Sequence, residues 1–172
     1  MDKKVTCRTI DGTTQEVLAS ELSFRPSVYG VVLRDDAVLL VPQWEGYDFP
    51  GGGVDLGELL TDTLVREVYE ETGLMVRPTQ VLHVQDDFFI HPYKKKALQT
   101  PLIYFLCEVV SGELSDAGFD TNEKEYAKKA EWVPLENVAS LIFKNPVDSP
   151  KLIQNAIRLK QFNESHQVRG AE

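Results

Sequence analysis

The sequence predicts an α/β fold in which a mixed β-sheet carries helices on both faces. Segments with strand character are interleaved with two or three helical segments along the 172 residues, and this interleaving is typical of a layered α/β domain. Hydrophobic residues make up 42% of the chain, enough for one core. We therefore predict a single domain over residues 1–172, beginning with a β-hairpin at residues 1–20 and ending in a frayed tail at residues 164–172.

The strands are placed by runs of β-branched and aromatic residues between turn signals. Asp11-Gly12 predicts the turn of a first hairpin, and Arg34-Asp35-Asp36 predicts the turn of a second hairpin with buried strands. The long strand after the first helix is expected to contain a bulge. In order, the strands are expected at residues 5–10, 15–18, 28–33, 38–41, 47–49, 74–87, 100–110 and 131–135.

Three helices complete the prediction. The first is expected to start at Thr61 as N-cap, with Leu64, Val65, Val68 and Tyr69 facing a core, and to end at Gly73. A short helix follows the last strand to about residue 141. The final helix begins at Asp148 or Ser149, with Pro150 in its first turn.

The first helix also carries an acidic stripe. Glu67, Glu70 and Glu71 are three and four residues apart, a spacing that places all three carboxylates on one helical face. Arg66 can pair with Glu70, but we expect one cation not to neutralise three anions. A stripe of this kind is usually a solvated helix face. Here the glycine run at residues 51–53 precedes it, and a backbone without side chains can approach a metal or phosphate closely.

The segment from Gly52 to Leu74 resembles the Nudix box, the signature of the Nudix hydrolase family. The resemblance implies an α/β/α sandwich with a mixed sheet, in which the box forms a loop-helix-loop motif. It also implies Mg²⁺- or Mn²⁺-dependent hydrolysis of a nucleoside diphosphate linked to another group X, because hard oxygen ligands suit these cations. The matching residues are Gly52, Glu58, Arg66, Glu67, Val68, Glu70, Glu71, Gly73 and Leu74.

By the same resemblance, the box supplies the catalytic machinery. Glu67 is the candidate base for water, although the position of the base varies in the family, and Arg66 orients a box carboxylate. A late-loop acid is expected to join the metal site, and either Glu125 or Glu123 can supply it. The catalytic residues implied are Glu67, Glu70 and Arg66, and the metal ligands implied are Glu67, Glu70, Glu71, the Gly51 carbonyl, Glu58 and Glu125.

Substrate selection must come from outside the box. Aromatic side chains can stack on a nucleobase and cations can meet phosphates, although core packing and solvated turns are the ordinary alternatives. Pro92 and Tyr93 hint at ADP-ribose or dinucleoside polyphosphates without selecting either. The residues predicted to bind substrate are Arg25, Trp44, Phe88 and Tyr93.

Composition indicates which partners and which cellular location the protein has. A net charge of −9 disfavours stable nucleic-acid binding, and bound cations must reverse the local field before a polyanionic substrate can approach. The sequence shows no membrane span and no signal segment. Cys7 and Cys107 lack metal spacing and indicate a reducing, cytoplasmic setting. The N-terminal hairpin offers an edge for a homodimer.

Two other functions remain compatible with the sequence. A nucleotide-sensing module could keep the fold without catalysis, but such a module has no need of an intact set of box acids. An isoprenyl-diphosphate isomerase on the same fold would need a cysteine and a glutamate as acid and base. Neither Cys7 nor Cys107 lies in a context that resembles this chemistry.

Overall fold

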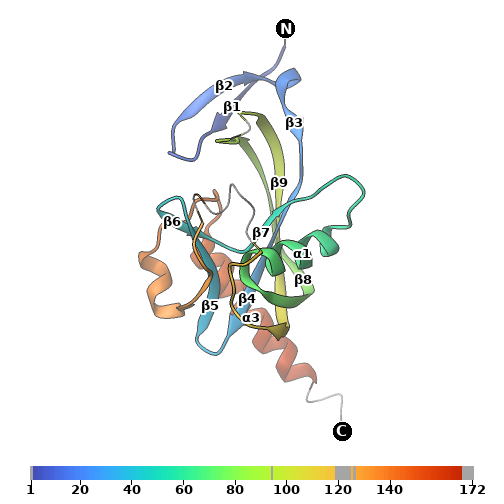
Figure 1. The fold of residues 1–172 in the computed structure, drawn as a ribbon, viewed down its shortest axis with the longest axis vertical. Helices are drawn as coiled ribbons and strands as arrows, with labels where there is room; N and C mark the ends of the chain where they lie inside the picture. Colours follow the sequence, from blue (N-terminus) through green and yellow to red (C-terminus); the bar gives the residue numbers. More distant parts are fainter. Residues whose placement is uncertain (1, 94, 119–124, 126, 168–172) are drawn as a thin grey trace.

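The computed structural model describes residues 2–93, 95–118, 125 and 127–167 of the chain (Figure 1). The strands are β1 (Lys4–Arg8), β2 (Thr14–Leu18), β3 (Ser23–Phe24), β4 (Ser27–Arg34), β5 (Ala37–Gln43), β6 (Gly46–Asp48), β7 (Gly51–Gly53), β8 (Leu74–Ile90), β9 (Ala97–Gly112) and β10 (Glu131–Pro134). The helices are η1 (Ala19–Glu21), α1 (Leu60–Thr72), η2 (Leu135–Ser140) and α3 (Ser149–Gln167).

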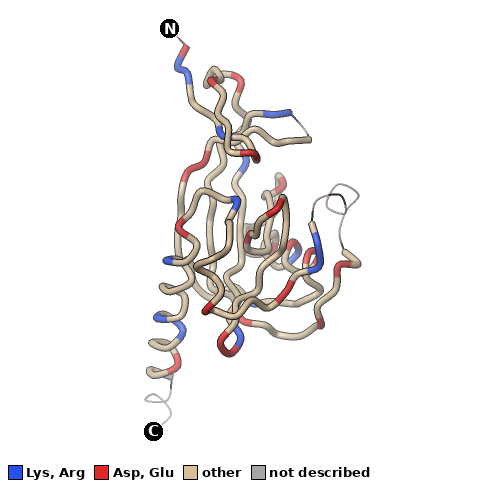
Figure 2. The backbone as a smooth tube through the Cα atoms, turned by 90° about the vertical axis from the view of Figure 1, so that its left-hand side faces the viewer, with Lys and Arg blue, Asp and Glu red and all other residues tan. Residues whose placement is uncertain are grey.

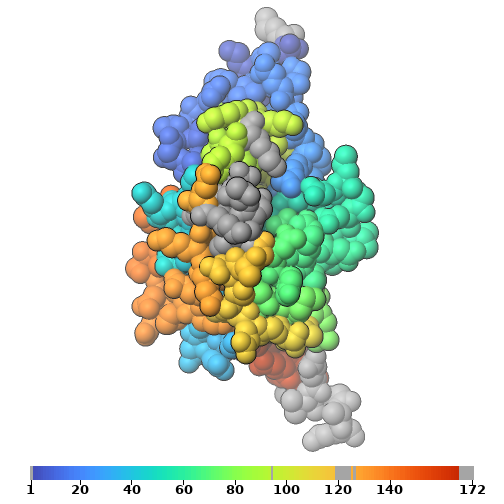
Figure 3. Space-filling view, in the orientation of Figure 1, coloured from blue at the N-terminus to red at the C-terminus, as the bar shows by residue number. Residues whose placement is uncertain are grey.

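The predicted mixed sheet is confirmed. Its strands run in the order β10-β5-β4-β9-β8-β1-β2, with β3 beside β9, β6 beside β5 and β7 beside β4. Strand β4 pairs with β9 in parallel, whereas β8 and β9 pair antiparallel along most of their length. The β1–β2 hairpin joins the sheet through one parallel bridge to β8, between Arg8 and Phe89. Figure 3 shows this hairpin in blue above the yellow-green residues at the end of β8 and the start of β9.

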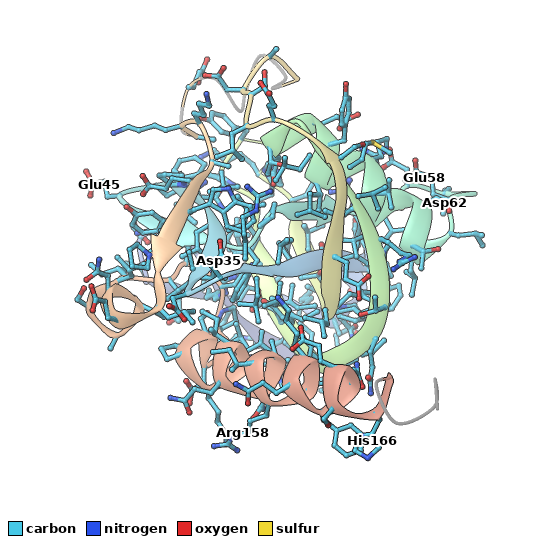
Figure 4. The ribbon with its side chains drawn as sticks, turned by 90° about the horizontal axis from the view of Figure 1, so that it is seen from below. Asp35, Glu45, Glu58, Asp62, Arg158 and His166 are labelled. Carbon is cyan, nitrogen blue, oxygen red and sulfur yellow. The ribbon has the colours of Figure 1, made fainter. Side chains whose placement is uncertain are left out.

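Helices cover both faces of the sheet, as predicted. On one face, Leu64 and Val68 of α1 pack against β4 and β5. On the other face, Leu152, Ile153 and Ala156 of α3 complete a second hydrophobic cluster. Seen from below (Figure 4), α3 crosses one side of the sheet while its Arg158 and His166 point outwards. Because alternate residues of a strand face opposite sides, the two clusters share strands without sharing residues.

Both hairpins and the long bulged strand occur where the sequence predicts them. Gly12 has a φ of +85° in the first turn, and Asp35 has a φ of +49° in the second. Both are residue types that tolerate the left-handed region. Strand β8 changes register with β9 at three points, and each bulge alters which side chains face the core.

The predicted N-cap of α1, Thr61, is wrong by two residues. The helix begins at Leu60, and its N-cap Leu59 makes no side-chain capping hydrogen bond. Instead Thr63 donates to the Glu58 carboxylate at 2.7 Å, so Glu58 ties the preceding loop to the first turn in place of Thr61. Tyr69, predicted to be buried, is 53% exposed. The helix does end at Gly73, which has a φ of +75°.

Side-chain contacts explain where the last helix begins and why it continues beyond residue 163. The Asp148 carboxylate accepts a hydrogen bond from the Lys151 backbone amide at 3.1 Å, which makes Asp148 the cap. The helix continues through residues 164–167, where the sequence predicts fraying. There the rings of Phe162 and His166 stack at 4.0 Å, and Ser165 donates to the Phe162 carbonyl. The rest of the predicted tail, residues 168–172, lies outside the described residues.

None of the helices in the described part of the chain is both long and apolar enough to cross a membrane. Figure 2 shows acidic positions spread over several loops, while basic and acidic positions share α3.

Candidate active site

A cavity of about 450 Å³ lies beside the acidic helix. Most of the site residues predicted from the sequence line it together, although they come from five different elements or loops. Glu58 and Phe88 do not line it, Glu125 is exposed and precedes β10 in the chain, and Glu123 lies outside the described residues. The predicted residues that line the cavity are Arg25, Trp44, Gly51, Arg66, Glu67, Glu70, Glu71 and Tyr93.

Arg66 stands at the centre of the acidic cluster. Its Nη1 donates to Glu67 at 2.9 Å and to Glu70 at 3.1 Å, while Nε and Nη2 donate to the two oxygens of Glu58 at 2.9 and 2.8 Å. Arg66 thus pairs with Glu70, as expected, and it also contacts Glu67 and Glu58; that one positive charge does not neutralise the three anions of the stripe stays an expectation. A guanidinium has five N–H donors in a fixed fork, and one residue can use them on several acceptors at once.

These contacts shift the protonation equilibria of the cluster. The Arg66 fork and the Thr63 hydroxyl lower the pKa of Glu58 to about 2, so Glu58 is ionised at any pH near neutrality. The same carboxylates raise the pKa of Arg66 above its ordinary value, Glu58 contributing most. Figure 4 shows Glu58 beside Asp62 at the entrance to α1. Glu58 thus fixes the orientation of Arg66 from outside the cavity.

The glycine run lets the acids approach the backbone. The Gly51 amide donates to the Glu71 carboxylate at 2.8 Å, and Glu71 is buried with only 8% exposed. A Cβ at Gly52 would lie 2.5 Å from the Glu67 carboxyl carbon. Gly52 is therefore required because the Glu67 carboxylate occupies the space of a side chain, and not because of an unusual backbone angle.

The donor set suits a hard divalent cation. Glu67, Glu70 and Glu71 supply carboxylate oxygens to one cavity wall, the ligand type that Mg²⁺ and Mn²⁺ prefer. Within the described residues, no three acidic, histidine or cysteine side chains converge as a ready-made metal cluster. The reason is geometric, since Arg66 holds Glu67 and Glu70 while the Gly51 amide holds Glu71. The residues fit such a cation chemically, and a bound cation would compete with Arg66 for the carboxylates of Glu67 and Glu70.

Arg25 adds a cation to the glycine side of the cavity. Its Nη2 donates to the Gly53 carbonyl at 2.9 Å and reaches Asp55 at 3.3 Å. A Cβ at Gly53 would lie only 2.0 Å from the guanidinium, so the bare backbone makes room for it. The side chain remains about one third exposed, which leaves it available to an anionic group bound beside the acids.

An aromatic group borders another part of the cavity. The rings of Trp44 and Tyr93 lie 5.6 Å apart in a tilted pair, and Trp44 sits in a turn with a φ of +50°. Partial burial and a hydrogen bond to the Glu125 carboxylate raise the pKa of Tyr93. Phe89 lines the cavity in place of Phe88. The bulges of β8 make the facing side of this pair hard to predict from alternation alone.

Sequence reasoning missed the polar end of the cavity. Asp48 accepts hydrogen bonds from the Gln43 amide and from the Asn145 backbone, at 3.0 and 3.1 Å. Burial raises the pKa of Asp48 to about 7, although these donors and Arg8 lower it. The available signal was a single acidic residue between aromatic neighbours, Asp48 between Tyr47 and Phe49.

Both cysteines are core residues. Cys7 and Cys107 are buried. Burial raises the pKa of Cys7, with Asp87 and Glu16 adding to the effect, and it raises the pKa of Cys107 to about 12. A thiol in such surroundings is a poor acid and a poor nucleophile. This geometry agrees with the sequence argument against isomerase chemistry.

Comparison with known proteins supplies the remaining evidence. A family model described as the NUDIX domain matches residues 23–156. An ADP-ribose pyrophosphatase of Methanocaldococcus jannaschii is 32% identical over 139 residues, which cover 78% of this chain and 73% of that protein. An RNA pyrophosphohydrolase of Psychrobacter sp. is 30% identical over 130 residues, covering 67% of this chain and 75% of that protein.

Solved structures share the fold at low identity. A NUDIX hydrolase from Nitrosomonas europaea aligns with a TM-score of 0.61 and 20% identity, covering 80% of this chain and 90% of that one. A UDP-X diphosphatase aligns with a TM-score of 0.58 and 16% identity, covering 82% of this chain and 64% of that one.

Proposed function

This chain belongs to the Nudix hydrolase family, whose enzymes act on phosphoanhydrides, and from that premise we propose a specific reaction. The protein hydrolyses a nucleoside diphosphate linked to a second group X, with Mg²⁺ or Mn²⁺ as cofactor. The observation that carries this proposal is the meeting of Glu67, Glu70 and Glu71 with the glycine run and Arg25 in one cavity. A homodimer and a cytoplasmic setting remain part of the proposal.

The acids of α1 would hold the divalent cation. Glu67, Glu70 and Glu71 are its proposed ligands, joined by the Gly51 carbonyl and, from outside the cavity, by Glu58 and Glu125. When bound, the cation supplies charge neutralisation of the diphosphate and a lowered pKa for a coordinated water. Arg66 would then orient whichever of these carboxylates stays hydrogen-bonded to it. This role explains why one guanidinium contacts three acids.

Glu67 is the proposed general base. Its side chain is 12% exposed and lies against Gly52, so the position of its carboxylate is restricted. A base must be held within hydrogen-bond reach of the water that it deprotonates. The backbone of Gly52 on one side and Arg66 on the other provide this restraint. Arg25 would meet a phosphate oxygen as the substrate's charge enters the cavity.

The group X must be recognised away from the acids. Trp44 and Tyr93 form an aromatic border that can stack on a flat ring, whereas Phe88 falls outside the cavity lining and Phe89 falls within it. The names of the relatives suggest ADP-ribose, a UDP-linked compound or the 5′ end of RNA as substrates. Of these we favour a small nucleotide, because the net charge of −9 opposes a long polyanion.

A screen of substrate classes tests this function. Purified protein is incubated with ADP-ribose, UDP-sugars, dinucleoside polyphosphates, nucleoside triphosphates and 5′-triphosphorylated RNA, with Mg²⁺ and with EDTA. We expect a small nucleotide to be cleaved to two phosphate-bearing products in Mg²⁺ only. Binding without cleavage would support the sensing module instead, preferred cleavage of RNA would refute the small-molecule assignment, and an undiminished rate in EDTA would refute the metal.

A further inference from the structure

The cavity beside the acids is completed by residues from outside the family domain. The family model begins at residue 23, whereas Arg8 is the last residue of β1 and lines the cavity. Arg8 is also the residue through which the N-terminal hairpin pairs with β8. In Figure 1 the hairpin lies beyond the end of the main sheet, next to the outer portions of β8 and β9. The hairpin thus reaches the cavity through Arg8 and through Ile10, which also lines it.

Arg8 bridges three parts of the chain. Its Nε lies 3.0 Å from both oxygens of Asp87, and its Nη2 donates to the same carboxylate at 2.7 Å. Its Nη1 donates to the Lys144 carbonyl at 3.1 Å, and its Nη2 reaches the Asn145 side-chain oxygen at 3.4 Å. The guanidinium lies 4.6 Å above the Phe89 ring. Such a fork on a carboxylate that is only 6% exposed holds a defined geometry.

The contact with Arg8 determines which way the Asn145 amide faces. A guanidinium carries donors and no acceptors, so only the oxygen of Asn145 can face it. The amide nitrogen then lies on the other side, near the hydroxyls of Tyr29 and Tyr104. Neither this nitrogen nor the Tyr104 hydroxyl has a well-aligned hydrogen-bond partner among the described residues. Both atoms are buried, so the Asn145 amide is held between the Arg8 guanidinium and the two tyrosine hydroxyls at the place where Asn145 lines the cavity.

The charges around Arg8 determine which kind of ligand group can bind at this end of the cavity. Arg8 is neutralised by Asp87, and the Asp48 carboxyl lines the same end. Among the residues that the structure describes, a phosphate would meet no unpaired cation there and would lie close to a carboxyl. A neutral group with hydrogen-bond acceptors, attached to a flat ring that can lie near Phe89, matches the lining better. The cavity is thus divided between an anion-accepting half at α1 and a neutral half at Arg8.

We propose that Arg8 is a positioning residue, which orients Asn145 so that this end of the cavity accepts the uncharged nucleoside part of the substrate. The inference rests on the proposed function, since it assumes a nucleotide ligand. It adds that the N-terminal hairpin belongs to the substrate site, so that recognition depends on a segment that precedes the family domain. Arg8 acts through Asn145 and takes no part in bond cleavage.

The test compares Arg8→Lys with wild type on the nucleotide that is hydrolysed fastest. Lysine keeps the positive charge beside Asp87 but loses the fork that faces Asn145. We expect KM to rise about tenfold while kcat changes less than about threefold, because ground-state and transition-state binding weaken together. A double variant, Arg8→Gln with Asp87→Asn, removes the charge pair as a unit and keeps the test valid if Arg8→Lys folds poorly. Arg77→Lys, in an exposed pair with Glu108, is the matched control and should leave KM unchanged.

A double-mutant cycle separates positioning from general support of the fold. In an Asn145→Ala background, Arg8→Lys should raise KM by less than about twofold, because the residue through which it acts is absent. Equal effects in both backgrounds, or an unchanged KM in Arg8→Lys, would overturn the proposal.

Calorimetric titration of AMP, UMP and GMP in EDTA distinguishes failure of the proposed function from failure of the role proposed for Arg8. If wild type binds one of them more tightly than Arg8→Lys but cleaves no nucleotide, the proposed function fails and the role of Arg8 stands. If wild type neither binds nor cleaves any nucleotide, both proposals fail.

Discussion

Replacement of Glu70 by Gln is expected to lower turnover by about 10²- to 10⁴-fold while the protein stays folded. Glutamine has nearly the same shape and can still accept the hydrogen bond that Arg66 donates to Glu70 at 3.1 Å. It lacks the charge with which Glu70 would bind a divalent cation, whose contribution to the transition state is several kcal/mol. Glu70 is 42% exposed, so the change in the free energy of unfolding should stay within about 1 kcal/mol. Steady-state kinetics in saturating Mg²⁺ and thermal unfolding measure the two effects.

Glu108→Gln is the control for this substitution. Glu108 forms an exposed ion pair with Arg77 on β8 and β9 and lies outside the cavity lining. The same chemical change there should leave turnover at the wild-type value. Equal turnover in Glu70→Gln and wild type would show that Glu70 belongs to a solvated helix face and has no role in catalysis.

Replacement of Gly52 by Ala is expected to reduce kcat by about 10- to 100-fold with little loss of stability. The added Cβ would lie 2.5 Å from the Glu67 carboxyl group, so this carboxylate must move. The clash is with the far end of a side chain, and the φ of Gly52 suits any residue, so the fold can absorb the change. A displacement of about 1 Å at a catalytic group can cost about 10²-fold in rate. Kinetics and thermal unfolding again give the readout.

Gly57→Ala provides the opposite pattern as a control. Gly57 has a φ of +94°, and a Cβ there would meet no atom within 4 Å. Alanine at this position should cost about 1–2 kcal/mol of stability, because its backbone is left-handed, and should leave kcat near the wild-type value. If Gly52→Ala loses stability but keeps its rate, Glu67 does not need its place against the backbone.

The elements of the fold could be predicted because their signals are local. Turn residues, apolar periodicity and Gly73 place the hairpins and the end of α1 within a residue or two. The errors have local causes as well. Thr61 was favoured as a cap by residue type, but Glu58 contacts Thr63 and holds the first turn in its place.

The acidic half of the cavity could be predicted for the same reason, since Glu67, Glu70 and Glu71 share one helix. The pairing of Arg66 with Glu58 could not, because it depends on how the loop before α1 returns to the helix. The polar half of the cavity, around Arg8, could not be predicted because its residues are far apart in the sequence. Asp87 and Asn145 lie 79 and 137 residues from Arg8 in the sequence, and the pairing of β1 with β8 brings Arg8 beside Asp87. Roles that depend on tertiary contacts of this kind leave no periodic pattern in the sequence.

The claim on which the account depends is that the carboxylates of α1 bind a divalent cation. Anomalous diffraction from crystals soaked in Mn²⁺ tests it directly, because Mn²⁺ has the ligand preferences of Mg²⁺ and can be located by its own scattering. We predict at least one anomalous peak bonded to carboxylate oxygens of Glu67, Glu70 or Glu71, with Glu67 or Glu70 turned away from Arg66. A map without a peak at these acids, in crystals of protein that hydrolyses its substrate in Mn²⁺, would contradict the account.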